Sequence, residues 1–426
     1  MTPALSAKPM KGSGIAWVGA MPSHWQAKRV KFLFSLAQRA PSPNDGIVTA
    51  FRDGQVTLRS NRRTAGFTNA LKESGYQGVR KGDLVIHAMD AFAGAIGVSD
   101  SDGKCTPVYS CCIPLSDASS DFYARCVRTM ATTGYIESLA KGIRERSTDF
   151  SWATFSEQVL PVPPRSEQDA IVAYLERTTT RIDALVTKKM RFIDLLREKR
   201  QALITHAVTK GLYPEAVMKD SGVEWLGAVP ETWDTAPLRV FLKLRRDIVG
   251  SSSATTKLLS LTLQGVIERD LENPTGKMPA SFDGYQRISY GEMVFCLFDI
   301  DETPRTVGVA PQDGMLTGAY AVFQPRSQLW SRYLYYFFLH VDEYKRLKPF
   351  YKGLRKTIRP RPFLSIQVPR PPATEARDII AHLDRATSRI DTLIAKTERS
   401  IELLREHRTA LITAAVTGKI DLRSAA

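Results

Sequence analysis

The stretch RIDALVTKKMRFIDLLREKRQALITHAVT, from Arg181 to Thr209, returns as RIDTLIAKTERSIELLREHRTALITAAVT from Arg389 to Thr417. Nineteen of the 29 aligned positions are identical, at a constant offset of 208 residues. Apolar residues recur in both copies at steps of three and four, which predicts two long helices with a coiled-coil-like seam. The predicted seam residues are Ile171, Leu175, Ile182, Leu185, Phe192, Leu196 and Leu203 in the first copy, and Ile379, Leu383, Ile390, Leu393, Leu404 and Leu411 in the second.

Both helices have clear predicted ends. The proline clusters PVPPRSEQ (161–168) and PRPPATEA (369–376) block helix upstream, and TKG (209–211) and TGK (417–419) supply glycine stops. A helix from Glu167 to Thr209 would be about 65 Å long at 1.5 Å per residue, too long to bury its apolar stripe within one small domain. We therefore expect the two copies to pair antiparallel about a pseudo-twofold axis. Pairing with helices of another chain is the alternative.

The repeat extends through the rest of the chain. MKGSGIAWVGAMPSHW (10–25) matches MKDSGVEWLGAVPETW (218–233) at nine of 16 positions, again offset by 208. GYQGVRKGDLVIHAMD (75–90) pairs with GYQRISYGEMVFCLFD (284–299), where apolar runs between glycines predict short buried strands. The predicted fold class is α/β (α+β), with two repeated modules of mixed strands and helices. The predicted domains are modules at 1–160 and 213–368 and helical segments at 161–212 and 369–426.

Bulk composition limits the class of protein. Five cysteines in 426 residues do not form a secreted disulfide framework, and no apolar run approaches a membrane span or a leader segment. We therefore expect a cytoplasmic chain without a membrane partner. The net charge of +15 favours a polyanionic partner, and most of it lies outside the repeated helical segments.

No catalytic motif is found in the sequence. It lacks a phosphate-binding loop with Lys-Ser/Thr, a His-Glu-x-x-His pair and the Asn-Pro-Pro-aromatic motif of adenine methyltransferases. The adjacent pair Cys111 and Cys112 is poorly spaced for chelation, so buried strand cysteines are the better interpretation. We expect a non-catalytic chain with no metal and no cofactor of its own.

Binding chemistry is better represented. Phosphate contact needs Lys or Arg, and base readout needs side chains such as Arg, Asn or Gln. The candidate DNA-binding residues are Arg59, Asn61, Arg62, Arg63, Lys141, Arg144 and Arg146 in the first module, and Lys352, Arg355, Lys356, Arg359 and Arg361 in the second. For each of them the alternative is an ordinary solvated loop, and for Arg144 and Arg355, which both copies keep, a structural turn.

Shared and unshared residues suggest different roles. Gln77 and Gln286 occur in both copies although the residues around them differ, so they fit phosphate contact or the fold better than base readout, which would differ between two diverged modules. Base readout then falls to unshared positions such as Asn61, Asn69 and Lys257. The repeated tryptophans fit packing better than stacking on nucleic acid; they are Trp17, Trp25, Trp225 and Trp233.

The helical motifs VPPRSEQDAIVAYLERTTTRIDAL and IDLLREKRQALITHAVTKG, with their C-terminal copies and the two tryptophan lead-ins, carry a family resemblance over residues 10 to 422. The chain resembles the DNA-specificity subunit of type I restriction-modification systems. One departure is Ala376, which stands where the family usually has the glutamine seen at Gln168.

The resemblance implies that each module is a target recognition domain reading half of a bipartite, asymmetric site on double-stranded DNA. It also implies that the helices space the modules and dock two modification (adenine methyltransferase) subunits, which restriction subunits with nuclease and translocase activity then join. S-adenosylmethionine would bind the modification subunits, and ATP and Mg would bind the restriction subunits. The alternative function is a non-catalytic protein-interaction scaffold with weak, nonspecific nucleic-acid binding.

Overall fold

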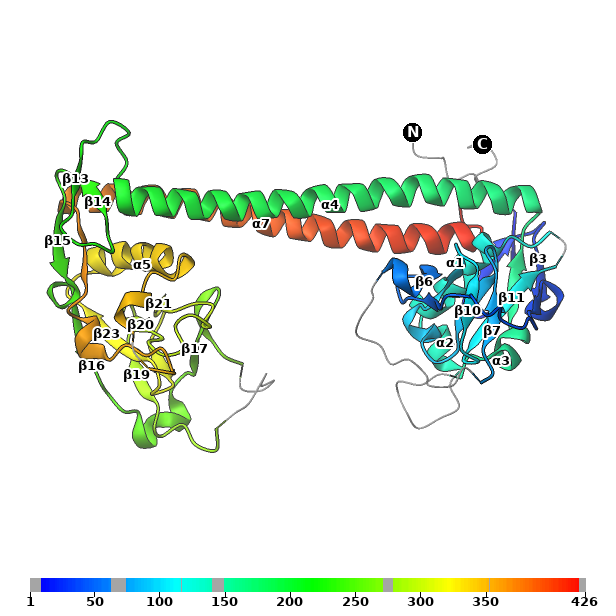
Figure 1. Ribbon diagram of the computed structural model, residues 1–426, viewed down its shortest axis with the longest axis horizontal. Helices are drawn as coiled ribbons and strands as arrows, with labels where there is room; N and C mark the ends of the chain where they lie inside the picture. Colours follow the sequence, from blue (N-terminus) through cyan, green and yellow to red (C-terminus); the bar gives the residue numbers. More distant parts are fainter. Residues whose placement is uncertain are drawn as a thin grey trace. The chain divides into compact units, whose positions relative to one another are not determined.

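The computed structural model describes residues 9–62, 74–115, 117–139, 149–270, 279–351 and 353–420. The chain forms two compact units, one of Met1–Lys189 with Arg399–Ala426 and one of Met190–Glu398. The predicted long helices are present as α4 (Arg165–Lys210) and α7 (Ala373–Val416), coloured green and red in Figure 1. Each helix starts after its proline cluster and stops just before its glycine, which confirms both predicted ends.

The first unit is built on a four-stranded antiparallel sheet in the order β4-β11-β8-β9, with α1 packed against β8 and β9. Its strands are β1 (Met10–Gly12), β2 (Ala20–Pro22), β3 (Gln26–Arg29), β4 (Phe34–Leu36), β5 (Val48–Ala50), β6 (Val56–Leu58), β7 (Gln77–Val79), β8 (Leu84–His87), β9 (Ile96–Val98), β10 (Gly103–Cys105), β11 (Tyr109–Pro114) and β12 (Val159–Val162). Its shorter helices are α1 (Ser120–Thr132), α2 (Tyr135–Ser138), α3 (Trp152–Ser156) and the 3-10 turns η1 (Val30–Phe32), η2 (Arg59–Asn61) and η3 (Ala91–Ala93).

The second unit repeats this sheet as β16-β23-β20-β21, with α5 in the place of α1. Its strands are β13 (Met218–Asp220), β14 (Ala228–Pro230), β15 (Asp234–Pro237), β16 (Leu242–Arg245), β17 (Leu259–Thr262), β18 (Gly265–Glu268), β19 (Gln286–Ile288), β20 (Met293–Phe295), β21 (Val307–Val309), β22 (Gly314–Leu316), β23 (Ala321–Pro325) and β24 (Gln367–Arg370). Its shorter helices are α5 (Gln328–Glu343), α6 (Pro360–Phe363), η4 (Leu238–Val240), η5 (Gly250–Thr255) and η6 (Lys348–Phe350). The mixed, repeated fold predicted from the sequence is confirmed.

Each central sheet is buried on both faces, which explains its continuous apolar strands. In β8, Leu84 and Ile86 join a core with α1 and the ends of both long helices, whereas Val85 joins a second cluster. In that second cluster Val85 meets Val48 of β5 and Val56 of β6. Because successive strand residues point to opposite faces, a strand buried on both sides shows no polar alternation.

Within each unit, α4 and α7 run antiparallel. In the second unit Arg197 forms an ion pair with Glu398 at 3.4 Å, and Arg200 forms one with Asp391 at 3.0 Å. A later residue of α4 thus contacts an earlier residue of α7, as expected for antiparallel helices. In the first unit Asp183 lies 2.9 Å from Arg408 Nε. Exposed ion pairs of this kind contribute little stability, so the apolar seam supplies most of the attraction between the helices.

The seam follows the predicted period, with three predicted residues corrected. Of the predicted residues, Ile171, Leu175, Ile182, Leu196, Ile379, Leu383, Ile390 and Leu411 are buried, and Leu203 and Leu404 are half-buried. Leu185 and Leu393 were predicted in the seam but are 43% and 39% exposed, and Phe192 is exposed as well. The step after Ile182 or Ile390 is four residues, not three, so the half-buried Val186 and Ile394 take the contact positions.

The four repeated tryptophans pack inside the protein. Trp25 and Trp233 are 1% and 0% exposed, and Trp17 and Trp225 pack against the same two cores. Trp25 Nε1 donates a hydrogen bond to Glu167 Oε2 at 2.9 Å, which ties the lead-in to the start of α4. The packing interpretation of the tryptophans is therefore confirmed.

The cysteines, including Cys111 and Cys112, are all free and buried. Within the described ranges there is no group of three or more His, Cys, Asp or Glu side chains arranged to hold a metal ion. No helix in the same ranges is long and apolar enough to cross a membrane.

Histidine 340 gives the second unit a predicted dependence on pH. His340 is 4% exposed, and its ring nitrogens contact Thr205 Oγ1 of α4 at 3.0 Å and the Arg346 guanidinium at 3.2 Å. Burial, and secondly the charge of Arg346, lower the pKa of His340 to about 4. Because Arg346 can only donate, the neutral ring accepts at Nε2 and donates from Nδ1 to Thr205.

Acidification is expected to destabilise the second unit through this residue. In the unfolded chain His340 has a pKa near 6.5, whereas in the folded chain its pKa is about 4. The unfolded state therefore binds the proton first, and the unfolding free energy falls as the pH is lowered from about 6.5 to about 4. Between pH 7 and pH 5 the loss is about 2 kcal/mol of unfolding free energy. Urea unfolding of the full chain and of His340→Gln at both pH values measures it. An equal pH dependence in the two proteins would contradict the assignment.

Candidate nucleic-acid interface

In the first unit, the described candidates surround the turn η2 at the end of the β5–β6 hairpin. Arg59 Nε donates to Thr49 Oγ1 at 3.3 Å, and Asn61 Nδ2 donates to Thr57 Oγ1 at 2.8 Å. Arg62 forms an ion pair with Asp53. These contacts hold polar groups at one hairpin, yet they also occupy part of its donor capacity. Arg63, Lys141, Arg144 and Arg146 lie outside the described residues.

In the second unit, candidate cations lie on the segment from Gly353 to Arg361, while Lys352 is outside the described residues. Arg355, Arg359 and Arg361 are exposed, and no residue in the described ranges forms an ion pair with any of them. Lys356 differs, because its ammonium group lies 2.5 Å from Glu302 and 3.3 Å from Asp301. The hydrogen bond to Glu302 raises the pKa of Lys356. Three arginines on this segment therefore remain available for an anionic partner.

The backbone of this segment is fixed by the rest of the unit. The amide of Asp299 donates to the carbonyl of Arg355 at 2.9 Å, and the amide of Ile358 donates to the carbonyl of Leu297 at 2.9 Å. Tyr351 Oη donates to Asp301 Oδ2 at 2.8 Å, which lowers the pKa of that carboxyl group. Anchored cations lose less freedom on binding than cations on a loose loop.

One exposed residue of the segment was missed by the sequence reasoning. Leu354, between Gly353 and Arg355, is fully exposed. The only sequence signal was that the first copy also has an aliphatic residue there, Ile143. A basic segment that presents an apolar side chain can contact phosphate and an apolar base edge, such as a thymine methyl group, together.

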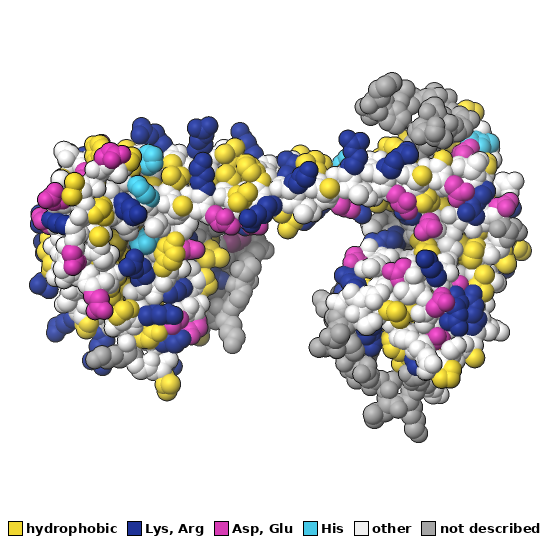
Figure 2. Space-filling model, turned by 45° about the horizontal axis from the view of Figure 1, so that its top comes forward, with side chains coloured by type: hydrophobic (Ala, Val, Ile, Leu, Met, Phe, Trp, Pro, Cys, Tyr) yellow, Lys and Arg dark blue, Asp and Glu magenta, His cyan; other side chains and the backbone are white. Residues whose placement is uncertain are grey.

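Basic side chains are not confined to this segment. Figure 2 shows Lys and Arg side chains spread over both units and along the helices, with Asp and Glu between them. Because charges of both signs are interspersed, net charge alone does not locate a DNA path. Unpaired arginines on an anchored backbone are the more specific feature.

The glutamines shared by both copies have a structural role. Gln77 Nε2 donates to the carbonyls of Tyr109 and Thr106 at 2.6 and 3.3 Å. Gln286 Nε2 donates to the carbonyls of Tyr320 and Thr317 at 2.5 and 3.3 Å. Each side chain fastens the turn that leads into β11 or β23. Of the two roles left open for these residues, the fold is the one observed.

Replacing Gln286 with alanine is expected to lower the unfolding free energy by about 1–3 kcal/mol, because buried carbonyls lose their donor. Gln286 is 4% exposed, so water does not readily take its place. Denaturant unfolding of the full chain measures the change. The exposed Gln264 of the same unit is the control, and Gln264→Ala should change stability by less than about 0.5 kcal/mol. Equal effects of the two substitutions would be inconsistent with a structural glutamine.

The unshared positions are only partly described. Asn69 lies outside the described residues, and Asn61 is held by Thr57 as given above. Lys257 Nζ lies 3.0 Å from Glu268 Oε2 and 3.4 Å from Gln312 Oε1. Base readout by Lys257 would require it to leave these partners.

The long helices carry exposed apolar residues that the sequence analysis had placed in the seam or had not named. Leu185 and Leu403 lie in the first unit, and Phe192, Leu195 and Leu393 lie in the second. Counting from the seam within each unit, these residues fall on the side of the helix pair opposite the ion pairs. Those ion pairs are formed by Asp183 in the first unit and by Arg197, Asp391 and Glu398 in the second. Met190, also exposed, is on the ion-paired side.

The fold was compared with solved structures. A chain from a type I R-M system, solved in a study of its complex assembly and conformational transition, matches with a TM-score of 0.67 at 15% identity, over 94% of this chain and 99% of that one. The HsdS subunit from Thermoanaerobacter tengcongensis matches with a TM-score of 0.55 at 16% identity, over 94% and 98%. This chain has the fold of a type I specificity subunit.

The specificity-subunit fold spans essentially the whole chain, including both units and both long helices. No protein-family model matches the sequence, and no curated protein matches it either. The likeness is therefore one of fold at low sequence identity, so the chemistry of the candidate residues rests on this chain's own geometry.

Proposed function

We propose that the chain is the DNA sequence-specificity subunit of a type I restriction-modification complex. In this role it is non-catalytic, and each unit reads one half of a bipartite, asymmetric site on double-stranded DNA. The observation that carries the proposal is the specificity-subunit fold over 94% of the chain. The unpaired arginines on the anchored segment 353–361 support DNA as the partner.

The helices would dock two modification subunits in the same proposal. The exposed pairs Leu185 with Leu403 and Leu393 with Leu195 are related by the 208-residue repeat. Each unit thus offers the same apolar positions once, which fits two copies of one partner. Exposed leucines on a helix face gain by burial against a partner helix, at about 25 cal/mol per Å².

The remaining partners and cofactors belong to the complex. S-adenosylmethionine would bind the modification subunits and supply the methyl group, whereas ATP and Mg would bind the restriction subunits. The cytoplasm, where DNA and ATP are available, is the proposed compartment.

Co-expression with the neighbouring modification subunit, followed by sequencing of methylated DNA, tests the function. We expect one bipartite adenine-methylated motif that is absent without this chain. Exchanging residues 24–160 for those of another specificity chain should change one half of the motif and leave the other unchanged. If both halves changed together, the modules would not read independently, and if no motif appeared, the scaffold alternative would be favoured.

Docking has its own test. Leu195→Ser with Leu403→Ser should abolish co-purification with the modification subunit while the chain stays folded, because both side chains are already in water. Met190→Ser, at a similarly exposed apolar residue of α4 on the ion-paired side, is the control. Full retention of the partner by the double variant would remove these leucines from the interface.

A further inference from the structure

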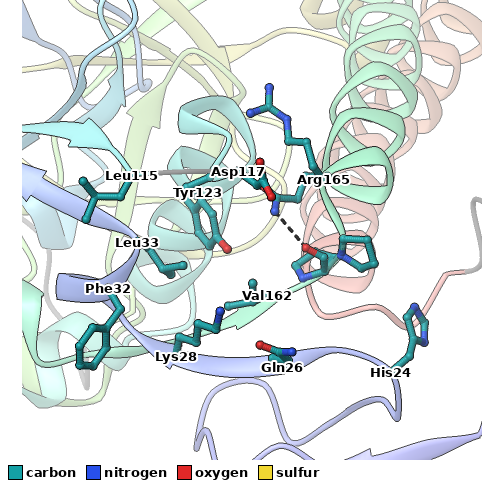
Figure 3. A pocket seen from close by; sticks show the side chains of 14 residues that line it. His24, Gln26, Lys28, Phe32, Leu33, Leu115, Asp117, Tyr123, Val162 and Arg165 are labelled. Carbon is teal, nitrogen blue, oxygen red and sulfur yellow. Dashed lines mark hydrogen bonds between the residues drawn. The ribbon is translucent and has the colours of Figure 1, made fainter.

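A cavity of about 280 Å³ in the first unit lies where β3, the start of α4 and the N-terminal end of α1 meet. Figure 3 shows Lys28 and Phe32 along one side, Tyr123 and Leu115 from the other, and Arg165 at the start of α4. All of these residues belong to one compact unit.

The hydroxyl group of Tyr123 is the unusual feature of this cavity. Tyr123 is 0% exposed and its ring packs edge-on against Phe34 and Phe122. Its hydroxyl is directed into the cavity in Figure 3 and has no hydrogen-bond partner among the described residues. Burial raises the pKa of Tyr123, so the hydroxyl stays protonated as a donor. An unsatisfied buried donor is costly, so an acceptor in the cavity would relieve it.

Most other polar groups of the wall already have partners. Gln168 uses both ends of its amide, accepting from the amide of Ser119 at 2.9 Å and donating to the carbonyl of Pro163 at 3.0 Å. Arg165 is paired with Asp169 at 3.0 Å. Lys28 is exposed at the cavity edge and has no ion pair within the described ranges. Tyr123 and Lys28 therefore remain as donors, together with the exposed side-chain amide of Gln26, which makes no hydrogen bond within the described ranges.

The charge of the cavity selects among anions. One free ammonium group and one hydroxyl match the single charge and two oxygens of a carboxylate. A phosphate group brings a charge of about −1.5 to −2 at neutral pH, more than Lys28 alone neutralises. Asp117 on the same wall repels any anion, and it repels a phosphate group more strongly than a carboxylate because the phosphate carries more charge. The exposed ring of Phe32 and the side chain of Leu115 offer an apolar surface beside the donors.

The fold does not require these residues. At the repeat offset of 208, Lys28 corresponds to Ala236 and Arg165 to Ala373. Around Tyr123 the shared residues Tyr109 with Tyr320 and Arg144 with Arg355 set the offset at 211, so Tyr123 corresponds to Leu334. Leu334 is apolar and buried, so it has no hydroxyl group to satisfy. The second unit folds with none of these polar groups, so their presence in the first unit is not explained by the shared scaffold.

We propose that this cavity binds a carboxylate carried on an apolar group, with Tyr123 and Lys28 donating to the carboxylate and Phe32 and Leu115 contacting the apolar part. The site is separate from the DNA candidates and does not depend on the proposed function. The carboxylate comes either from a free organic acid or from the C-terminus of a peptide.

Calorimetric titration of the full chain with 3-phenylpropionate and with N-acetylphenylalanine tests the proposal. We expect saturable binding at one site, weakened about tenfold or more by Tyr123→Phe and by Lys28→Met, since each removes a hydrogen bond to a charged group. Tyr290→Phe and Lys243→Met, both on exposed residues of the second unit, are the matched controls and should bind normally. Tyr123→Phe should not lower thermal stability without ligand, because it removes an unpartnered hydroxyl.

The two ligands distinguish the sources. Tighter binding of N-acetylphenylalanine assigns the site to a peptide C-terminus, and tighter binding of 3-phenylpropionate assigns it to a free acid. Three results would overturn the proposal: no saturable binding of either compound at millimolar concentration, unchanged affinity in Tyr123→Phe, or stronger competition by inorganic phosphate than by acetate.

Discussion

Replacing Arg355, Arg359 and Arg361 together with alanine is expected to weaken binding of a duplex target by about 100-fold. The three guanidinium groups are exposed and unpaired within the described ranges, so they can each contribute about 1 kcal/mol or more to phosphate contact. The slope of log K against log salt should fall by about 2.7, which is about 0.9 for each lost phosphate contact. Fluorescence anisotropy over a salt series measures both quantities.

Stability should be nearly unaffected by this triple substitution, because none of the three side chains makes an ion pair that the structure describes. The single variant Arg355→Ala is matched by Lys219→Ala, which removes one exposed charge from β13 of the same unit. We expect Arg355→Ala to change the slope and Lys219→Ala to leave it unchanged. An unaltered slope in the triple variant would place the DNA elsewhere on the protein.

The long helices could be predicted because their signal is local. Apolar residues at steps of three and four, prolines before the first turn and a glycine after the last fix both the type and the ends of a helix. Which single residues lie in the seam and which are exposed was less predictable. Leu185 and Val186 are adjacent and both apolar, so which of them enters the seam depends on the partner helix and not on the pattern.

The strands were predictable only as apolar runs. Most are three or four residues long and pair with distant segments, such as β3 with β12, where Lys28 lies opposite Leu160. No local signal indicates this pairing. Nor does one indicate that the last turns of α7 join the first unit, where Val416 packs in the core with Trp25. The structure divides into two compact units. The predicted division of the sequence into two modules and two helical segments remains a prediction.

The candidate site was predictable at the level of segments. Arg355 and Lys356 are neighbours of equal charge, yet one is free within the described ranges and the other is paired with Asp301 and Glu302, more than 50 residues away. The role of Gln286 likewise depends on the distant carbonyls of Thr317 and Tyr320. Sequence indicates which side chains could bind an anion, whereas the tertiary structure decides which of them remain available.

Replacing Gly418 with alanine is expected to destabilise the first unit by about 3 kcal/mol. Gly418 follows α7 with φ of +74°, and a Cβ there would lie 2.3 Å from Pro22 Cδ and 3.0 Å from Trp25 Cη2. The left-handed conformation costs an L-residue about 1–2 kcal/mol, and the overpacking adds about 1–3 kcal/mol. Since Pro22 and Trp25 belong to a rigid, buried lead-in, the end of α7 would have to move away from it.

Gly222→Ala is the matched control for this substitution. Gly222 has φ of +70° but nothing within 4 Å of a Cβ, so alanine there should cost only the backbone term of about 1–2 kcal/mol. Gly211→Ala should fall between the two, because its closest neighbour, at 2.6 Å, is the terminal oxygen of the flexible Glu375 side chain. Chemical denaturation of the three variants gives this order if the end of α7 closes the first unit by packing on Pro22 and Trp25. Equal losses of stability in Gly418→Ala and Gly222→Ala would show that the end of α7 does not contact Pro22 and Trp25. The first unit would then have to be stable without the last turns of α7.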